Sequence, residues 1–164
     1  MKNIVLIGMP GCGKSTVGSI LAQITGRSFS DIDKLIEEAA GKDITKIFSE
    51  DGEEKFRFLE TQILGEEIKK NELVIATGGG VVTKPENLGL MRQNSIIVFL
   101  KRELEELATN GRPLSLKKGI QTLAKQRLPL YEEWSDHIIS VEATPQQTAK
   151  QIYNKIGVKN ENRF

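Results

Sequence analysis

The sequence contains a single cysteine, Cys12, and a single histidine, His137. These counts exclude a disulfide framework, the usual zinc-ligand spacings and a nucleophilic pair of adjacent cysteine and histidine residues. The sequence also lacks an apolar run of the roughly 18 residues that cross a bilayer. Its first residues, 1–8, are too short for a signal peptide and predict a strand instead. We therefore expect a cytoplasmic protein that does not enter a membrane.

No charge of one sign is in excess, because 23 Lys and Arg stand against 22 Asp and Glu, a formal net charge of +1. A nearly neutral chain has no overall field that attracts a polyanion. Binding to nucleic acid or to a membrane surface is therefore disfavoured. Any anion that the protein binds must be held by a local cluster of side chains and backbone amides.

The chain has no internal repeat, low-complexity tract or linker rich in Pro, Gly and Ser. Its 164 residues, 38% apolar and 27% charged, are typical of one globular domain with its own core. We expect residues 1–158 to form that domain and residues 159–164 to form a frayed tail. We also expect a monomer.

Short apolar runs rich in Ile and Val predict strands at residues 4–7, 73–76, 96–100 and 137–141. They do not alternate with polar residues, which is typical of strands buried on both faces of a parallel sheet. A weaker fifth strand is predicted at residues 28–30. Strands that alternate with helices indicate a three-layer α/β/α sandwich. Helical spacing is present at residues 15–25, 33–40, 44–48, 53–70, 85–92, 117–133 and 145–156.

The first strand is followed by a phosphate-binding motif, Gly8-Met9-Pro10-Gly11-Cys12-Gly13-Lys14-Ser15-Thr16. This sequence fits the pattern G-x-x-x-x-G-K-[ST] and stands between a strand and a helix, as that motif requires. Its amides and the helix N-terminus would bind phosphates, Lys14 would reach the β- and γ-phosphates, and the Ser15 hydroxyl would bind Mg²⁺. The nucleotide contacts predicted here are Gly11, Cys12, Gly13, Lys14, Ser15 and Thr16. The Cys12 thiol is either a small filler or a reactive group, and the sequence leaves this open.

Two carboxylates, Asp31 and Asp33, follow the weak strand. In an extended segment residues two apart project to the same side, so both acids are predicted to face the cleft while Ile32 faces the core. One acid would hold Mg²⁺ and the other would take a proton from an incoming hydroxyl. The alternative is that Asp33 only caps a helix that begins at Lys34, with Asp31 in a turn.

Two further features belong to the same end of the predicted sheet. Three consecutive glycines, Gly78, Gly79 and Gly80, follow a buried strand and suit a ligand that approaches the backbone, although a flexible turn is the alternative. Arg57 and Glu60 are neighbours on a predicted helix. They form either a surface ion pair or a cleft arginine whose fork matches a carboxylate and which Glu60 holds in place.

Taken in order, these motifs resemble those of the shikimate kinases. The matching residues, which lie between about Lys2 and Ile156, are Gly11-Cys12-Gly13-Lys14-Ser15-Thr16, Asp31-Ile32-Asp33, Phe56-Arg57 with Glu60, Gly78-Gly79-Gly80, Arg112-Pro113-Leu114 and Arg127 before Leu130-Tyr131. The resemblance implies a P-loop kinase with sheet order 2-3-1-4-5. It also implies an ATP:alcohol phosphotransferase that acts on the 3-hydroxyl of shikimate in aromatic amino-acid biosynthesis.

The resemblance also implies a role for each matched residue. Asp33 resembles the base that contacts the shikimate hydroxyls, and Asp31 resembles its partner on the metal side. Arg57 and Arg127 resemble the pair that holds the carboxylate. The catalytic set would be Asp33, Lys14 and Arg112, and the substrate contacts would be Asp33, Arg57, Gly78, Gly79, Gly80 and Arg127. ATP, shikimate and Mg²⁺ are thus the implied small-molecule partners.

The segment expected to be a lid, about residues 107–118, is shorter than in several family members and carries Arg112. Glu105 or Glu106 falls near the position of an expected arginine, and residues 141–144 lack another. We therefore expect either weaker nucleotide binding or a different stacking partner for the nucleotide. Alternatives are a kinase for another small acceptor, such as gluconate or a nucleoside monophosphate, and a nucleotide-binding module without turnover. His137, Trp134 and Tyr131 are interpreted as structural.

Overall fold

Five parallel strands form the centre of the protein, whose computed structural model describes residues 2–103 and 114–161. The strands are β1 (Asn3–Ile7), β2 (Ser28–Asp31), β3 (Leu73–Ala76), β4 (Ser95–Lys101) and β5 (His137–Ser140). The helices are α1 (Lys14–Thr25), α2 (Ile32–Ala40), α3 (Ile44–Asp51), α4 (Glu53–Ile68), the 3₁₀ helix η1 (Val81–Thr83), α5 (Pro85–Asn94), α7 (Leu114–Trp134) and α8 (Pro145–Glu161).

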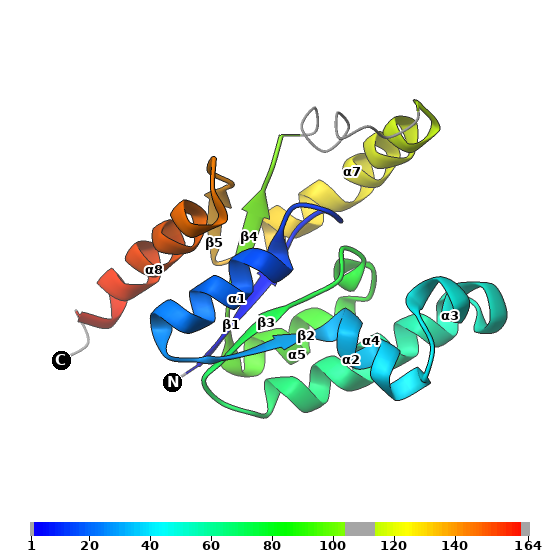
Figure 1. Cartoon of the computed structure of the whole chain (residues 1–164), viewed down its shortest axis with the longest axis horizontal. Coiled ribbons are helices and arrows are strands. Elements are labelled where there is room, and N and C mark those ends of the chain that lie inside the picture. The colour runs from blue at the N-terminus through cyan, green and yellow to red at the C-terminus, as the bar shows by residue number, and fades with distance from the viewer. Residues whose placement is uncertain (1, 104–113, 162–164) are drawn as a thin grey trace.

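The strand order is β2-β3-β1-β4-β5, and every neighbouring pair is parallel, so the predicted order 2-3-1-4-5 is confirmed. Helices α1 and α8 pack together on one face of the sheet, and α4, α5 and α7 cover the other face, which gives the predicted three layers (Figure 1). In this arrangement the carboxyl ends of the strands lie along one edge, where ligands bind in open parallel sheets.

Burial explains why some strands were easier to predict than others. All residues of the central strands β1 and β3 are buried, which matches their continuous apolar sequences. The strand β2 lies at an edge of the sheet, and one of its four residues is fully buried. An edge strand needs few apolar residues, and this accounts for the weak signal at residues 28–30.

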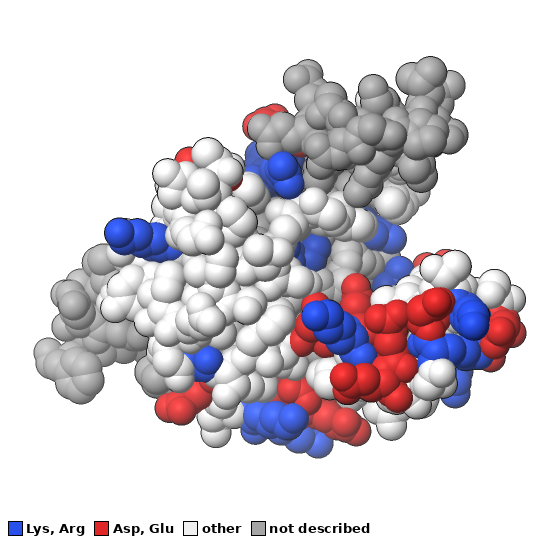
Figure 2. Space-filling model, in the orientation of Figure 1, with Lys and Arg blue, Asp and Glu red and all other residues white. Residues whose placement is uncertain are grey.

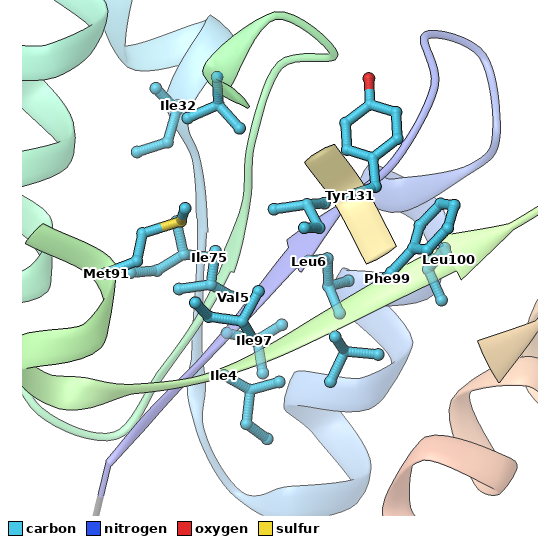
Figure 3. Close-up of a cluster of buried hydrophobic side chains, with 14 of the residues drawn as sticks. Ile4, Val5, Leu6, Ile32, Ile75, Met91, Ile97, Phe99, Leu100 and Tyr131 are labelled. Carbon is cyan, nitrogen blue, oxygen red and sulfur yellow. The ribbon is translucent and has the colours of Figure 1, made fainter. Parts of the chain in front are cut away.

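The core is built from aliphatic side chains of the central strands and the helices that cover them. Figure 3 shows Ile4, Val5, Leu6 and Ile97 within this cluster. Trp134 and Tyr131, interpreted as packing residues, are 4% and 0% exposed. In the segments that the structure describes, no helix is both long and apolar enough to cross a membrane.

Acidic and basic side chains are mixed on the surface shown in Figure 2, where they gather over α2 and α3. Lys42, for example, pairs with Glu50 at 2.8 Å and with Asp51 at 2.6 Å. Opposite charges that lie this close largely neutralise each other's field at a distance, and salt screens the remainder beyond about a Debye length. The cluster therefore does not make a surface of one sign.

Some predicted boundaries are wrong. Helix α2 begins at Ile32, directly after β2, and the Asp31 side chain caps it by accepting from Lys34 N at 3.4 Å. Asp31 and Asp33 are therefore not two residues of one extended segment, and Asp33 is not the cap. Helix α8 continues to Glu161, beyond the predicted end at residue 156. The expected lid, up to residue 113 and including Arg112, lies outside the described residues.

A buried asparagine, Asn3, joins β1, α4 and β3 at the amino ends of the strands. The Asn3 amide donates to Ile68 O at 3.2 Å and Lys70 O at 2.8 Å, and its carbonyl accepts from Leu73 N at 2.9 Å. Asn94 donates to the same two carbonyls. The contact that only Asn3 supplies is thus the one to Leu73 N.

We predict that Asn3→Ala lowers the free energy of unfolding by about 1–3 kcal/mol, because it leaves the buried Leu73 N–H without an acceptor. Urea denaturation followed by circular dichroism measures this change. The matched control is Asn154→Ala, at an exposed position of α8, which should stay within about 0.5 kcal/mol of the parent. Equal stability of the two variants would contradict the prediction.

Candidate active site

The loop between β1 and α1 is shaped by glycines with positive φ. The φ angles of Gly8, Gly11 and Gly13 are 155°, 78° and 95°, values that other residues rarely adopt. A Cβ atom at Gly8 would also lie 2.7 Å from Leu100 O. Helix α1 begins at Lys14 without a side-chain cap, so its first N–H groups remain available to an anion.

The Lys14 ammonium lies within this loop, and the residue as a whole is 7% exposed. It donates to Gly8 O at 2.7 Å and Met9 O at 2.9 Å, and lies 3.6 Å from Cys12 Sγ. The positive charge is therefore held at the centre of the loop. Cys12 is 1% exposed, which favours the interpretation of this thiol as a small filler.

Ser15 and Asp31 meet beside the loop, from the first turn of α1 and the end of β2. Ser15 Oγ donates to Asp31 Oδ2 at 2.7 Å, and the contact is exposed to solvent. A hydroxyl and a carboxylate are ligands that suit Mg²⁺, which usually keeps several waters and substrate oxygens. The described residues contain no group of three or more His, Cys, Asp or Glu that could hold a metal. The pair fits a Mg²⁺ ion that phosphate oxygens and water help to bind.

Asp33 lies in the first turn of α2 and faces the same region. Burial and then the nearby Asp31 raise the pKa of Asp33, while Lys14 and Arg57 act in the opposite direction. Its Oδ1 atom is buried and has no hydrogen-bond partner among the described residues. Asp33 also lines the cavity described below, where its carboxylate can meet a ligand.

Arg57 and Glu60 form a buried pair on α4 and not a surface ion pair. Arg57 Nη1 lies 3.0 Å from Glu60 Oε1, and the two side chains are 11% and 0% exposed. Burial raises the pKa of Glu60, and Arg57 opposes this rise by charge and by its hydrogen bond. The Glu60 carboxylate thus holds the guanidinium in place, and the alternative of a surface ion pair is wrong.

The three glycines after β3 are required by close approach. A Cβ atom at Gly78 would lie 2.8 Å from Asp33 Oδ1, and one at Gly80 would lie 2.2 Å from Arg57 Nη2. A Cβ atom at Gly79 would lie 2.6 Å from the ring of Pro10 in the phosphate loop. Side chains and the neighbouring loop are packed directly on this backbone, so the alternative of a flexible turn is wrong.

Arg127 approaches the same loop from α7. It is close enough to Glu60 and to the Tyr131 hydroxyl to lower the pKa of each group. The Tyr131 hydroxyl in turn donates to Gly79 O. Sequence reasoning placed Arg127 here through the family resemblance but missed Tyr131. A tyrosine four residues after an arginine on one helix face was the available signal.

Two phenylalanines that were not among the predicted site residues lie next to Arg57. The rings of Phe48 and Phe56 lie 4.7 Å apart, and the Arg57 guanidinium carbon lies 5.1 Å from the centre of the Phe56 ring. Phe48 is 37% exposed, although it belongs to the apolar side of α3. Together they form an apolar wall next to a fixed positive charge.

A cavity of about 290 Å³ joins the phosphate loop to the glycine loop. Its lining includes Lys14, Ser15, Asp33 and Gly79, together with Thr77, whose hydroxyl donates to Leu6 O at 2.7 Å. The structure therefore brings the loop, the candidate base and the glycines together. Arg57 borders Gly80, and Arg112 lies outside the described residues.

Known proteins resemble this chain over most of its length. A sequence model of the shikimate kinase family matches residues 10–157. A shikimate kinase of Prochlorococcus marinus (strain MIT 9211) is 41% identical over 156 residues, which cover 90% of this chain and 79% of the relative. A shikimate kinase of Thermodesulfovibrio yellowstonii is 40% identical over 162 residues, covering 93% of each chain.

Solved structures also resemble the fold of this chain. Shikimate kinase from Acinetobacter baumannii in complex with shikimate superposes with a TM-score of 0.91 at 34% identity, over 97% of this chain and 94% of that one. A gluconokinase from Sinorhizobium meliloti has a TM-score of 0.62 at 18% identity, over 98% and 94% of the two chains, and shares the fold alone. The family match over most of the sequence, and identities near 40% across nearly the whole chain, show that this protein belongs to the shikimate kinase family.

Proposed function

We propose that this protein transfers the γ-phosphoryl group of ATP to the 3-hydroxyl of shikimate, giving ADP and shikimate 3-phosphate. The observation that carries the proposal is the shared cavity, in which the Asp33 carboxylate and the phosphate loop lie together beside Gly78 and Gly79. A kinase needs these two halves close to each other, because positioning supplies most of the catalysis of phosphoryl transfer. The solved relative that binds shikimate supports this choice of acceptor.

On the nucleotide side, the loop amides and the N-terminus of α1 would hold the phosphates. Lys14 would exchange its contacts with Gly8 O and Met9 O for phosphate oxygens. Ser15 and Asp31 would hold Mg²⁺, Asp31 acting through a coordinated water. Bound Mg²⁺ supplies charge neutralisation at the β- and γ-phosphate oxygens. Arg112 is proposed to add charge from the lid.

On the acceptor side, Arg57 and Arg127 would bind the shikimate carboxylate. Arg57 has the geometry for this because Glu60 fixes its guanidinium, and a fixed fork matches the two oxygens of a carboxylate. The amides of Gly79 and Gly80 would donate to hydroxyls, and the rings of Phe48 and Phe56 would cover the apolar part of the ring.

Asp33 would then accept the proton of the 3-hydroxyl as this oxygen attacks the γ-phosphorus. Asp33 lines the cavity beside the phosphate loop, where a substrate hydroxyl would reach its carboxylate. Burial also raises the proton affinity of Asp33, which favours proton transfer from an alcohol. The cytoplasmic location, the monomeric state and the place in aromatic amino-acid biosynthesis belong to the same proposal.

The acceptor is tested by incubating the protein with ATP, Mg²⁺ and either shikimate, gluconate or a nucleoside monophosphate. We expect ADP release with shikimate to exceed release with each other acceptor by at least about tenfold, because only shikimate combines a carboxylate with neighbouring hydroxyls on a rigid ring. Release with shikimate no faster than without an acceptor would contradict the proposal. Faster release with gluconate or with a nucleotide would reassign the substrate.

We predict that Asp33→Asn lowers kcat by about 100-fold or more while both KM values stay within about tenfold, as expected for a lost base. Steady-state assays measure both constants. The matched control is Glu38→Gln, the same change at an exposed position of α2, which should keep the parent kcat. Unchanged turnover of Asp33→Asn would reduce Asp33 to a structural residue.

The same variant should change how stability depends on pH. Because the pKa of Asp33 is raised in the folded state, the folded protein binds this proton more tightly than the unfolded chain does. This contribution to stability is therefore present below the ordinary carboxyl pKa and is lost as the pH rises through the raised value. Urea unfolding between pH 4 and pH 8 should show Asp33→Asn gaining stability relative to the parent as the pH increases. A constant difference would contradict the assignment.

Removing either guanidinium should weaken shikimate binding selectively. We predict that Arg57→Ala and Arg127→Ala each reduce shikimate affinity by about 2 to 5 kcal/mol, the range for a desolvated charge contact, with ATP affinity nearly intact. Calorimetry with each ligand measures both affinities. Arg92→Ala, at an exposed position of α5, is the control.

The variant Arg57→Ala also leaves the buried Glu60 carboxylate without its partner, which is destabilising by itself. The double variant Arg57→Ala with Glu60→Gln removes that charge and should recover stability but not shikimate binding. Equal weakening of ATP and shikimate in the double variant would show that α4 had shifted and that Arg57 does not bind the acceptor directly.

A further inference from the structure

Tyr131 is completely buried, yet its hydroxyl is directed toward the site. Its ring packs against Phe99 with centroids 5.2 Å apart, and Figure 3 shows the hydroxyl pointing away from the cluster of aliphatic side chains. Burial raises the pKa of Tyr131 to about 12, so the group stays protonated and can donate at any pH at which the enzyme works.

The two neighbours of this hydroxyl belong to different parts of the site. It donates to Gly79 O, and the Arg127 guanidinium lies near enough to lower its pKa by charge. A phenolic hydroxyl has one hydrogen to donate, so the contact with Gly79 O defines the direction of that donor. The glycine loop is thereby held by an oxygen atom that the core keeps in place and that lies near Arg127.

The carbonyl of Gly79 and the N–H of Gly80 belong to the same peptide group. In a trans peptide these two groups point in opposite directions, and the described residues contain no cis peptide bond. A hydrogen bond that fixes Gly79 O on the side of α7 therefore also directs Gly80 N–H away from α7. Gly80 N–H is one of the donors proposed for the acceptor.

The contacts extend to the nucleotide side as well. A Cβ atom at Gly79 would lie 2.6 Å from the Pro10 ring, so this backbone is packed against the phosphate loop. Tyr131, Gly79 and Pro10 thus form one continuous series of contacts. A displacement of the Gly79 peptide would change the distance between the acceptor donors and the phosphates.

We infer that Tyr131 is a positioning residue for the acceptor: its hydroxyl sets the orientation of the Gly79–Gly80 peptide beside the Arg127 guanidinium. This inference deepens the proposed function and rests on the assignment of Gly80 N–H and Arg127 to shikimate. Tyr131 itself does not touch the reacting atoms. Its effect is on how the carboxylate and the hydroxyls of the substrate are held relative to the phosphate loop.

The test is Tyr131→Phe, which removes the hydroxyl and keeps the ring against Phe99. We expect the KM for shikimate to rise about tenfold, the range for one hydrogen bond between partly buried groups. We expect the KM for ATP to stay within about twofold and kcat within about threefold. The control is Tyr153→Phe, the same change at a tyrosine of α8 that is 46% exposed, which should keep all three constants.

A purely structural role would give a different result. Loss of packing would lower the melting temperature and raise both KM values together, or would leave the protein unfolded at the assay temperature. Either result, or an unchanged KM for shikimate, would overturn the inference. Melting curves of Tyr131→Phe and Tyr153→Phe are recorded alongside the kinetics to separate these cases.

A double-mutant cycle tests the link to Arg127. With Arg127→Ala as background, Tyr131→Phe should raise the KM for shikimate at least about threefold less than it does in the parent, because the charged neighbour of the hydroxyl is already gone. Additive effects would overturn the link. If the parent itself shows no shikimate-dependent ADP release, the proposed function fails. If the parent and Tyr153→Phe are active while Tyr131→Phe is unaffected, only the present inference fails.

Discussion

The site depends on the close approach of charged side chains to a backbone that has no side chains of its own. At residues 78–80 the Asp33 carboxylate, the Arg57 guanidinium and the Pro10 ring each occupy space that a Cβ atom would need. Because of this, groups from β2–α2, α4 and the phosphate loop converge on one short segment after β3. The parallel sheet brings these segments to one edge, and the glycines allow them to meet there.

This convergence places several charges out of water. The carboxyls of Asp33 and Glu60 both have a raised pKa because burial disfavours their charged forms, and Lys14 and Arg57 offset part of that cost. Each carboxyl also keeps a buried oxygen without a partner among the described residues. Unsatisfied acceptors of this kind reduce the stability of the protein and are typical of sites that a ligand completes.

How far the sequence could predict this arrangement depended on the kind of interaction. Continuous apolar runs encode the central strands, and a motif with fixed spacing encodes the phosphate loop. The structure has these strands and this loop where the sequence predicted them. The sequence predicted that Asp33 faces the cleft, but for the wrong reason. β2 ends at Asp31, and the first turn of α2, not an extended segment, carries Asp33 toward the cavity. The hydrogen bond from Tyr131 to Gly79 joins residues 52 positions apart, and no local sequence pattern predicts it. The burial of Arg57 with Glu60 likewise follows from how α4 packs, which spacing alone leaves open.

The burial of Glu60 also bears on how acceptor preference can change during evolution. A single replacement of Arg57 removes the hydrogen-bonded partner of the buried Glu60 carboxylate, and a single replacement of Glu60 removes the acceptor of the Arg57 Nη1 donor. Intermediates with one change would be poorly folded or poorly selective. With Arg57 in its proposed role, a change of preference to a neutral acceptor would therefore require both positions to change together.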